Sequence, residues 1–282
     1  MKGMPVLTAR GLGLAEAWEN SLIVLHERGG RIRTMYDKPE DPPSYDATML
    51  ITVEEPLAEP RIHQDFPGGL EDLEEYVMEV CDGIKDHLVR DPRDPHDTRW
   101  EYTYHGRLAA YTAPGLSQGA IDQLERIAQK LAQTPYTRRA QAVTWKAWED
   151  LDCYDPPCLQ SLWCRVTEEE GFPHLGMNVR FRSNDAYKAA FMNMFALVRL
   201  QERIAERLGE LSGREVRLGR YVHFADSYHL YGSYFREFEE RFLGGLKRRD
   251  FSERTLRYED VKPIMDEAHA AILEKVRALD RS

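Results

Sequence analysis

The segment from His174 to Arg182 constrains the fold of this chain more than any other part of the sequence. Its residues alternate strictly between polar and apolar types, and the apolar positions are Leu175, Met177, Val179 and Phe181. Successive side chains of a strand point to opposite faces, so this pattern predicts a strand with one buried face. The buried face needs a second layer to pack against, while the opposite face carries arginines into a polar environment.

Apolar residues recur at spacings of three and four on both sides of this strand, which predicts amphipathic helices. The predicted helices span 12–28, 70–84, 121–131, 189–211, 232–246 and 259–279, with Ser117 as the N-cap of the third. Further strands are predicted at 47–53 and 214–228, and a long loop at 31–46. No repeat or flexible linker interrupts the pattern, so we expect one α+β domain over residues 1–282.

The overall charge and the absence of special segments exclude several classes of protein. With 48 acidic and 38 basic residues the net charge is −10, which disfavours binding to a nucleic-acid polymer. No apolar run is long enough to span a membrane and no secretory signal opens the chain, so we expect a cytoplasmic protein. The cysteines form no CxxC pair, which argues against a metal site and a disulfide framework. They are Cys81, Cys153, Cys158 and Cys164.

Cys158 follows two prolines, Pro156 and Pro157, which stiffen the chain just before a strand-like segment. Rigid placement suits a nucleophile, but an isolated cysteine is more often a small buried core residue. A reactive thiolate also needs a nearby cation, and arginines cluster at 138–139 and at 182. Arginine pairs are commonly solvated surface charge. Neither the Pro-Pro-Cys segment nor the arginine clusters alone identify Cys158 as a nucleophile.

Four segments together carry a family resemblance. They are TRRAQAVTW, PPCLQS, RSNDAYKAAFMN and DSYHLYG, in this order between residues 137 and 232, with weaker counterparts in RIRT (31–34) and EYTYHGRL (101–108). Their sequence and spacing resemble the thymidylate synthase and deoxycytidylate hydroxymethylase family. The resemblance implies a mixed, twisted β-sheet that forms a homodimer interface and is flanked by helices. It also implies 5,10-methylenetetrahydrofolate, or a related pterin carrier, as the one-carbon donor.

The resemblance assigns the central chemistry to a few residues. Cys158 would be the nucleophile that adds to carbon 6 of a pyrimidine nucleotide monophosphate. Arg182 and Ser183 would hold the 5′-phosphate, and Arg182 would also help to keep the thiol ionised. Arg138 and Arg139 would reach the phosphate from the partner subunit, so that the two subunits share their sites.

Other matched positions would recognise the nucleotide. Asn193 stands where family members read the uracil edge with an amide, whereas deoxycytidylate hydroxymethylases tend to carry aspartate there. Asp185 belongs to the same substrate-binding segment. His229 and Tyr231 resemble the pair that binds the sugar 3′-hydroxyl, and strand alternation would point both side chains the same way.

Two upstream positions are matched less specifically. Tyr104 resembles an active-site tyrosine of the family, and a half-buried strand aromatic is an equal alternative. Arg33 resembles a mobile phosphate-binding arginine, a role for which Arg31 competes.

The general acid–base glutamate is expected on the helix at 70–84. We prefer Glu75 to Glu74 and Glu79 because its distance to Gly83 fits best. A solvated glutamate on a helix surface is the common alternative.

The chain also departs from the family pattern. Phe181 occupies the place of a usual glutamine, and Ser227-Tyr228-His229 replaces the usual Gly-Asp-x-His segment. These changes resemble a divergent, archaeal-like branch. The apolar C-terminal tail that closes over the folate has no clear counterpart in KVRALDRS, the last eight residues.

The resulting prediction is methylation of dUMP to dTMP. Attack of water instead of hydride on the same intermediate would give a 5-hydroxymethyl nucleotide, from dUMP, dCMP or CMP. A non-catalytic nucleotide-binding or RNA-binding relative is a further alternative, although binding alone has no need of Cys158.

Overall fold

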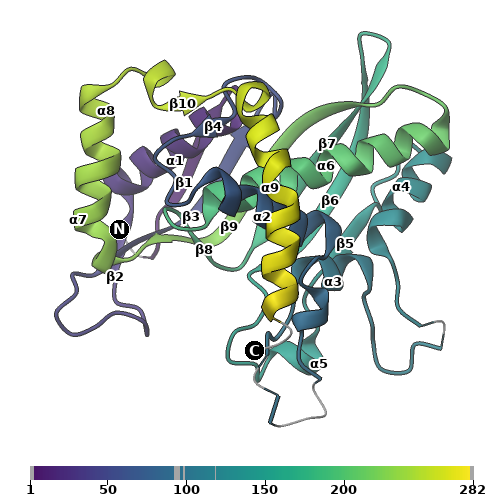
Figure 1. Cartoon of the computed structure of the whole chain (residues 1–282), viewed down its shortest axis with the longest axis horizontal. Coiled ribbons are helices and arrows are strands. Elements are labelled where there is room, and N and C mark those ends of the chain that lie inside the picture. The colour runs from purple at the N-terminus through teal and green to yellow at the C-terminus, as the bar shows by residue number, and fades with distance from the viewer. Residues whose placement is uncertain (1–2, 92–95, 98, 118, 280–282) are drawn as a thin grey trace. The chain divides into compact units, whose positions relative to one another are not determined.

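The computed structural model describes residues 3–91, 96–97, 99–117 and 119–279 (Figure 1). The α+β class with a mixed sheet and flanking helices is confirmed. The sheet contains β1 (Val6–Gly11), β2 (Gly30–Ile32), β3 (Ser44–Val53), β5 (Gln141–Val143), β6 (Leu159–Glu169), β7 (Phe172–Phe181), β8 (Asn184–Asp185) and β9 (Arg217–Leu230). A second, two-stranded sheet pairs β4 (Ile62–His63) with β10 (Thr255–Leu256).

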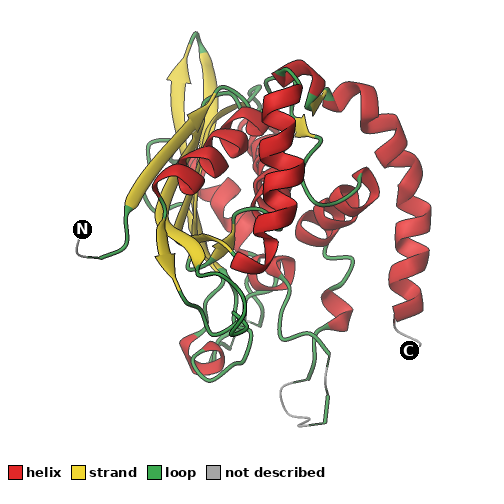
Figure 2. Cartoon of the chain, turned by 90° about the vertical axis from the view of Figure 1, so that its left-hand side faces the viewer, coloured by secondary structure: helices red, strands yellow, loops and turns green. Residues whose placement is uncertain are grey.

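The helices, strands and loops are distinguished in Figure 2. The α-helices are α1 (Leu14–Arg28), α2 (Leu70–Asp82), α3 (Tyr104–Ala109), α4 (Gln123–Gln133), α5 (Ala147–Asp150), α6 (Ala190–Ser212), α7 (Phe235–Glu237), α8 (Gly244–Arg248) and α9 (Tyr258–Leu279). Short 3-10 or π turns occupy Asp86–Leu88, Gly232–Tyr234, Phe238–Leu243 and Phe251–Glu253. No helix in the described ranges has the length and apolar character that crossing a membrane requires.

The chain divides into two compact units, each built from separate stretches of sequence. Unit 1 comprises 1–68, 178–195 and 220–262, and unit 2 comprises 69–177, 196–219 and 263–282. The predicted single domain over 1–282 stays a prediction. Its residues 1–2, 92–95, 98, 118 and 280–282 lie outside the described part.

Unit 1 is organised around Trp18 of α1, which is fully buried. The indole ring makes edge-on contacts with His63, Phe191 and Phe242, and its Nε1 donates a hydrogen bond to the carbonyl oxygen of Ala186 at 2.9 Å. Helix α1 packs on β1 and β3, which run parallel, while β3 and β9 are antiparallel. The amphipathic helix predicted at 12–28 therefore covers one face of the sheet.

The opposite face of these strands bears exposed side chains. Thr8 of β1 lies beside Leu50 of β3, which in turn lies beside Phe224 of β9. Val6 at the start of β1 is 74% exposed. Arg180 of β7 pairs with Asp226 on this face at 3.0 Å. Unit 1 thus presents a sheet surface of mixed apolar and charged residues, which we call the open sheet face.

Unit 2 contains the β5–β6 antiparallel pair and the helices α2 and α4. Met78 of α2 packs against Ile272 and Val276 of α9, the yellow helix of Figure 1. Leu131 of α4 is fully buried. The apolar stripes that predicted these helices therefore supply the core of the unit.

Most predicted elements are present, with informative exceptions. The N-cap of α4 is Asp122, whose side chain accepts a hydrogen bond from the backbone N–H of Glu125, and the prediction of Ser117 was wrong. A cap must stand directly before the first helical turn, and Ser117 lies too far upstream. The helix predicted at 232–246 is split into short helical, 3-10 and π segments. Strand β1 was not predicted at all.

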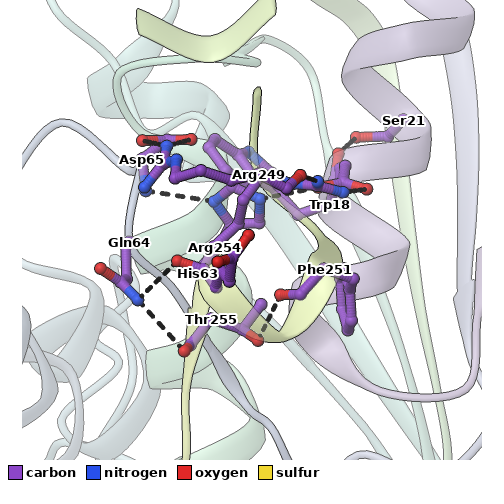
Figure 3. A network of polar contacts seen from close by, with 11 residues as sticks. Trp18, Ser21, His63, Gln64, Asp65, Arg249, Phe251, Arg254 and Thr255 are labelled. Atoms are coloured by element: carbon purple, nitrogen blue, oxygen red, sulfur yellow. Dashed lines mark hydrogen bonds and ion pairs between the residues drawn. The ribbon is translucent and has the colours of Figure 1, made fainter. Parts of the chain in front are cut away.

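A buried ionic network joins α1 to β4 and to the segment that leads into β10 (Figure 3). Glu19 accepts two hydrogen bonds from the guanidinium of Arg254, both at 2.9 Å, and one from Nε2 of His63 at 2.9 Å. Nδ1 of His63 accepts from the backbone N–H of Asp65, so its proton lies on Nε2. Burial raises the pKa of Glu19, but these bonds outweigh burial and leave its pKa lowered.

We predict that Arg254→Met destabilises the protein by about 3–5 kcal/mol at pH 7, because it leaves the Glu19 carboxylate buried without its partner. The folded pKa of Glu19 is lowered, so its contribution is present above its ordinary value of 4.5 and is lost as the pH falls through the folded pKa. Urea denaturation at pH 7 and at acidic pH measures both effects. The double variant Glu19→Gln/Arg254→Met should lose less free energy of unfolding than Arg254→Met alone. An equal or larger loss of stability would contradict the explanation.

Candidate active site

Cys158 lies at the point where the Pro-Pro segment becomes strand β6. The strand begins at the next residue, Leu159, whose backbone N–H donates a hydrogen bond to the hydroxyl of Tyr104 at 3.3 Å. Tyr104 opens α3, which Thr103 caps through a bond from the backbone N–H of Gly106. The tyrosine is therefore helical, and the alternative of a strand aromatic was wrong. The predicted nucleophile and the predicted tyrosine lie together in unit 2.

The other cysteines are poorer candidates for a nucleophile. Cys81 and Cys164 are buried, and burial raises the pKa of each thiol to about 12. Cys153 is half-buried, and burial together with Glu101 raises its pKa as well. Because the thiolate is the reactive form, a raised pKa disfavours these three thiols, and Cys158, which is half-buried, is the remaining candidate.

Tyr102 lies beside both Cys158 and Tyr104. Burial is the main cause that raises the pKa of Tyr102, and the neighbouring thiol of Cys158 adds to it. Burial also raises the pKa of Tyr104 well above its ordinary value. Both phenols therefore stay neutral near pH 7 and serve as hydrogen-bonding groups beside the thiol.

The glutamates of α2 differ in their surroundings. Glu75 is bonded to Lys85 at 2.7 Å and to Lys275 of α9 at 2.6 Å, and these lysines outweigh burial and lower its pKa. Glu74 is bonded to His269 at 2.7 Å. Glu79 is also bonded to Lys85, at 2.9 Å, but burial outweighs this and raises its pKa, and the charge of Glu75 adds to the rise. A general acid–base needs a pKa raised toward neutrality, so the direction of the shift makes Glu79 an alternative to Glu75, which stays the prediction from the sequence.

The predicted phosphate-binding residues follow directly after β7 in unit 1. Arg182 and Ser183 are half-buried, and the carbonyl oxygen of Arg182 accepts a bond from the N–H of Ser227 at 3.3 Å. Phe181, which replaces the family glutamine, is fully buried and stacks on His223 at 4.7 Å. Burial lowers the pKa of His223 to about 3, so this imidazole is neutral. Position 181 is thus part of an apolar core contact.

The predicted base- and sugar-binding residues also belong to unit 1. Asn193 is buried on the first turn of α6. The carboxylate of Asp185 accepts backbone N–H bonds from Tyr187 and Lys188, and burial raises its pKa. The rings of His229 and Tyr231 lie 4.7 Å apart. The register of the strands also brings Asp46 and Ser227 to His229, which sequence reasoning missed because no motif links residues so far apart.

The two competing arginines of the N-terminal loop are held differently. The guanidinium of Arg31 stacks 3.6 Å from the ring centre of Tyr45 and also donates to the carbonyl oxygen of Pro43 at 3.1 Å. Arg33 is exposed and donates to the carbonyl oxygen of Lys38 at 3.1 Å. Arg33 is therefore held by fewer contacts than Arg31, and the choice of Arg33 over Arg31 stays a prediction.

Arg138 and Arg139 are exposed in unit 2 just before β5. Both residues form hydrogen bonds through their backbone groups. The indole N–H of Trp163 donates to the carbonyl oxygen of Arg138, and the backbone N–H of Arg139 donates to the hydroxyl of Thr137. Within the described ranges, neither guanidinium forms an ion pair. Both cations are available to an anion outside this chain.

A pocket of about 520 Å³ in unit 2 shares Tyr102 with the surroundings of Cys158. Its lining includes Cys153 and Tyr102 but not Cys158, and its main charged side chains bind one another: Arg107 pairs with Asp150 at 2.8 Å and Lys146 with Glu149 at 3.3 Å. Because these charges are already satisfied, the pocket has no obvious anion-binding group.

Comparison with known proteins decides the family. The sequence model described as "Thymidylate synthase" matches residues 83–271, which is more than half of the chain. The chain belongs to the thymidylate synthase family. Membership of the thymidylate synthase family makes it an enzyme of one-carbon transfer to a pyrimidine nucleotide.

Relatives and a solved structure agree with this membership. A protein of Methanopyrus kandleri is 32% identical over 210 residues, which are 74% of this chain and 87% of the relative. One from Methanosarcina mazei is 28% identical over 197 residues, 70% of this chain and 76% of the relative. Both are named "Putative thymidylate synthase", and both fit the archaeal-like branch predicted from the sequence.

The fold is shared with thermostable thymidylate synthase A from Bacillus subtilis. The TM-score is 0.59 at 17% identity, and the similarity covers 85% of this chain and 86% of that one. At this identity the likeness establishes the fold of the thymidylate synthase family and no finer property.

We predict that Cys158 and Cys153 react with a thiol reagent in the folded protein and that Cys158 reacts faster. Cys81 and Cys164 should stay unreactive until the protein unfolds, because burial raises their pKa to about 12. Absorbance during labelling with a chromogenic disulfide at pH 8 counts the thiols. Cys158→Ala should remove the faster phase, and fast labelling of either buried thiol would contradict the assignment.

Proposed function

We propose that the protein transfers a one-carbon unit to carbon 5 of dUMP through a covalent adduct on Cys158, giving dTMP. The observation that carries this proposal is the placement of Cys158, a half-buried thiol at the start of β6 beside two neutral tyrosines. Membership of the thymidylate synthase family supports the reaction class.

The protein's own part in the chemistry begins with addition. The Cys158 thiolate forms a bond to carbon 6, and the electron pair of the C5–C6 double bond moves onto carbon 5 and the C4 carbonyl. Carbon 5 then bonds to the one-carbon unit and loses its proton to a base. The carrier would leave with the electron pair of its bond to the transferred carbon, and for methylation it would supply a hydride to that carbon. When the carbon 5 product is complete, the sulfur leaves with the electron pair of its bond to carbon 6, and the double bond re-forms.

The phosphate and the base are assigned to residues of unit 1. We propose that Arg182 and Ser183 bind the 5′-phosphate, since a guanidinium and a hydroxyl are good phosphate ligands. Arg33, which is exposed and donates a hydrogen bond to the carbonyl oxygen of Lys38, would add a further contact to the phosphate. The amide of Asn193 offers both a donor and an acceptor, which matches the edge of uracil.

For the proton transfers we propose Glu79, with Glu75 as the alternative. Burial raises the pKa of Glu79 although Lys85 is bonded to it, whereas Lys85 and Lys275 together lower the pKa of Glu75. Glu75 would then act on Glu79 by charge repulsion, which is one cause of its raised pKa.

The proposed donor is 5,10-methylenetetrahydrofolate, which supplies the carbon and, for methylation, a hydride. Helix α9 continues to Leu279, and its Lys275 is bonded to Glu75. Attack of water instead of hydride on the same intermediate would give a 5-hydroxymethyl nucleotide, which is the second candidate function.

We further propose a homodimer that shares its phosphate sites. The open sheet face of unit 1 supports an interface, because Val6 and Leu50 are exposed there. Arg138 and Arg139 have no carboxylate partner among the described residues and would bind the phosphate held by the other subunit.

Incubation with dUMP, UMP, dCMP or CMP and methylenetetrahydrofolate, followed by mass spectrometry, tests the function. We predict a gain of a methyl group on dUMP, and a hydroxymethyl group on any of the four would instead establish the second candidate. Cys158→Ser should lower turnover at least ~10³-fold, because the nucleophile is lost. Cys153→Ser is the matched control, and full turnover by Cys158→Ser would exclude both candidates.

The two glutamate assignments make different predictions. Glu79→Gln should lower kcat by about 10²- to 10³-fold, since a general acid–base contributes on this order. Glu75→Gln should cost less than tenfold in kcat, and Glu74→Gln serves as a further control on the same helix. Steady-state kinetics on folded variants measures the three values. A larger loss for Glu75→Gln than for Glu79→Gln would restore the assignment made from the sequence.

Shared sites predict complementation between inactive variants. Cys158→Ala and the double variant Arg138→Ala/Arg139→Ala should each be inactive alone. After mixed unfolding and refolding, half of the dimers combine the two chains and hold one intact site in two, so about a quarter of the wild-type activity should return. A mixture of Cys158→Ala with Cys158→Ser controls for refolding. Failure to recover activity from a mixture shown to form dimers would contradict shared sites.

A further inference from the structure

His229 stands between two carboxylates on neighbouring strands. In the sheet register Asp46 of β3 lies directly opposite His229 of β9, and Asp185 of β8 lies opposite it on the other side. Directly paired residues point to the same face of a sheet, so the three side chains are lateral neighbours. His229 is buried, and burial raises the pKa of both carboxyl groups. The imidazole therefore sits in a partly desolvated acidic environment.

Ser227 connects one of these carboxylates to the imidazole. Its hydroxyl donates to Oδ2 of Asp46 at 2.9 Å, and its oxygen lies 3.3 Å from Nδ1 of His229. A hydroxyl has one proton to donate, and Ser227 has given it to Asp46. The contact with Nδ1 is therefore one in which the imidazole donates and the serine oxygen accepts. This requires the proton of a neutral His229 to be on Nδ1.

We infer that Asp46 and Ser227 are positioning residues that fix the tautomer of His229 and leave its Nε2 as a hydrogen-bond acceptor for a hydroxyl group of the nucleotide sugar. This inference rests on the proposed function, in which His229 and Tyr231 contact the 3′-hydroxyl. It adds the direction of that hydrogen bond and the residues that set it. Neither Asp46 nor Ser227 needs to touch the nucleotide.

The direction of the bond has a consequence for specificity. An accepting Nε2 pairs with a hydroxyl, which can donate, but not with a phosphate oxygen, which cannot. The carboxylates of Asp46 and Asp185 on either side add repulsion against an anion. The arrangement therefore selects a free 3′-hydroxyl and rejects both a 3′-phosphate and a 3′-deoxy sugar.

The tautomer can be measured without nucleotide or turnover. Long-range ¹H–¹⁵N correlation spectra at pH 8 report which imidazole nitrogen carries the proton, and a His229→Gln variant assigns the signals. Wild type and Ser227→Thr, which keeps the hydroxyl, should show the proton on Nδ1. Ser227→Ala should shift it toward Nε2. A wild-type proton on Nε2, or a Ser227→Ala spectrum equal to that of wild type, would overturn the inference even if dUMP is the substrate.

Ligand binding gives the second test. Calorimetry should show that Ser227→Ala raises the dissociation constant of dUMP about tenfold, which is the effect of one hydrogen bond. The dissociation constant of 2′,3′-dideoxy-UMP should change little. Ser227→Thr should restore the preference for dUMP. Equal weakening of both nucleotides by Ser227→Ala would mean a general structural role and contradict the inference. If neither the wild type nor any variant binds dUMP but the tautomer result holds, the proposed function fails. The role of Asp46 and Ser227 in setting the tautomer of His229 then still stands.

Discussion

The proposed catalysis depends on the fixed position of one sulfur atom, that of Cys158. Two prolines restrict the chain before Cys158, and the first residue of β6 anchors it immediately afterwards through the hydroxyl of Tyr104. That tyrosine is held by α3, whose first turn Thr103 caps. The backbone and helix α3 together fix the position of this thiol. Because its position is fixed, neighbouring groups such as Tyr102 and Tyr104 can set its reactivity.

Burial then decides which ionisable groups are available for chemistry. The same physical effect keeps the thiols of Cys81 and Cys164 protonated and raises the pKa of Glu79. Two hydrogen-bonded partners outweigh burial at Glu19 and at Glu75, whereas Lys85 alone does not outweigh it at Glu79. One type of side chain therefore serves as a structural ion pair at one position and as a candidate proton carrier one helical turn away.

Patterns that are local in sequence were predicted well, and contacts between distant segments were not. The alternation in 174–182 gave β7, and the Pro-Pro-Cys segment correctly preceded a strand. The preference for Glu75 over Glu79 follows spacing and stays a prediction, and the environment that distinguishes the two is created by Lys275, two hundred residues away. Asp46 and Ser227 are separated by 181 residues and meet only through strand register. No periodicity or motif encodes such a pair.

The proposed reaction begins with addition of Cys158 to carbon 6. Exchange of the hydrogen at carbon 5 with solvent measures this addition most directly. Once the sulfur is bonded, carbon 5 can take up a solvent proton and release its own, with no one-carbon donor present. Folded protein incubated with dUMP tritiated at carbon 5 should release tritium to water, Cys153→Ser should do the same, and Cys158→Ser should release none. Release by Cys158→Ser at the wild-type rate would contradict the assignment of Cys158 as the nucleophile.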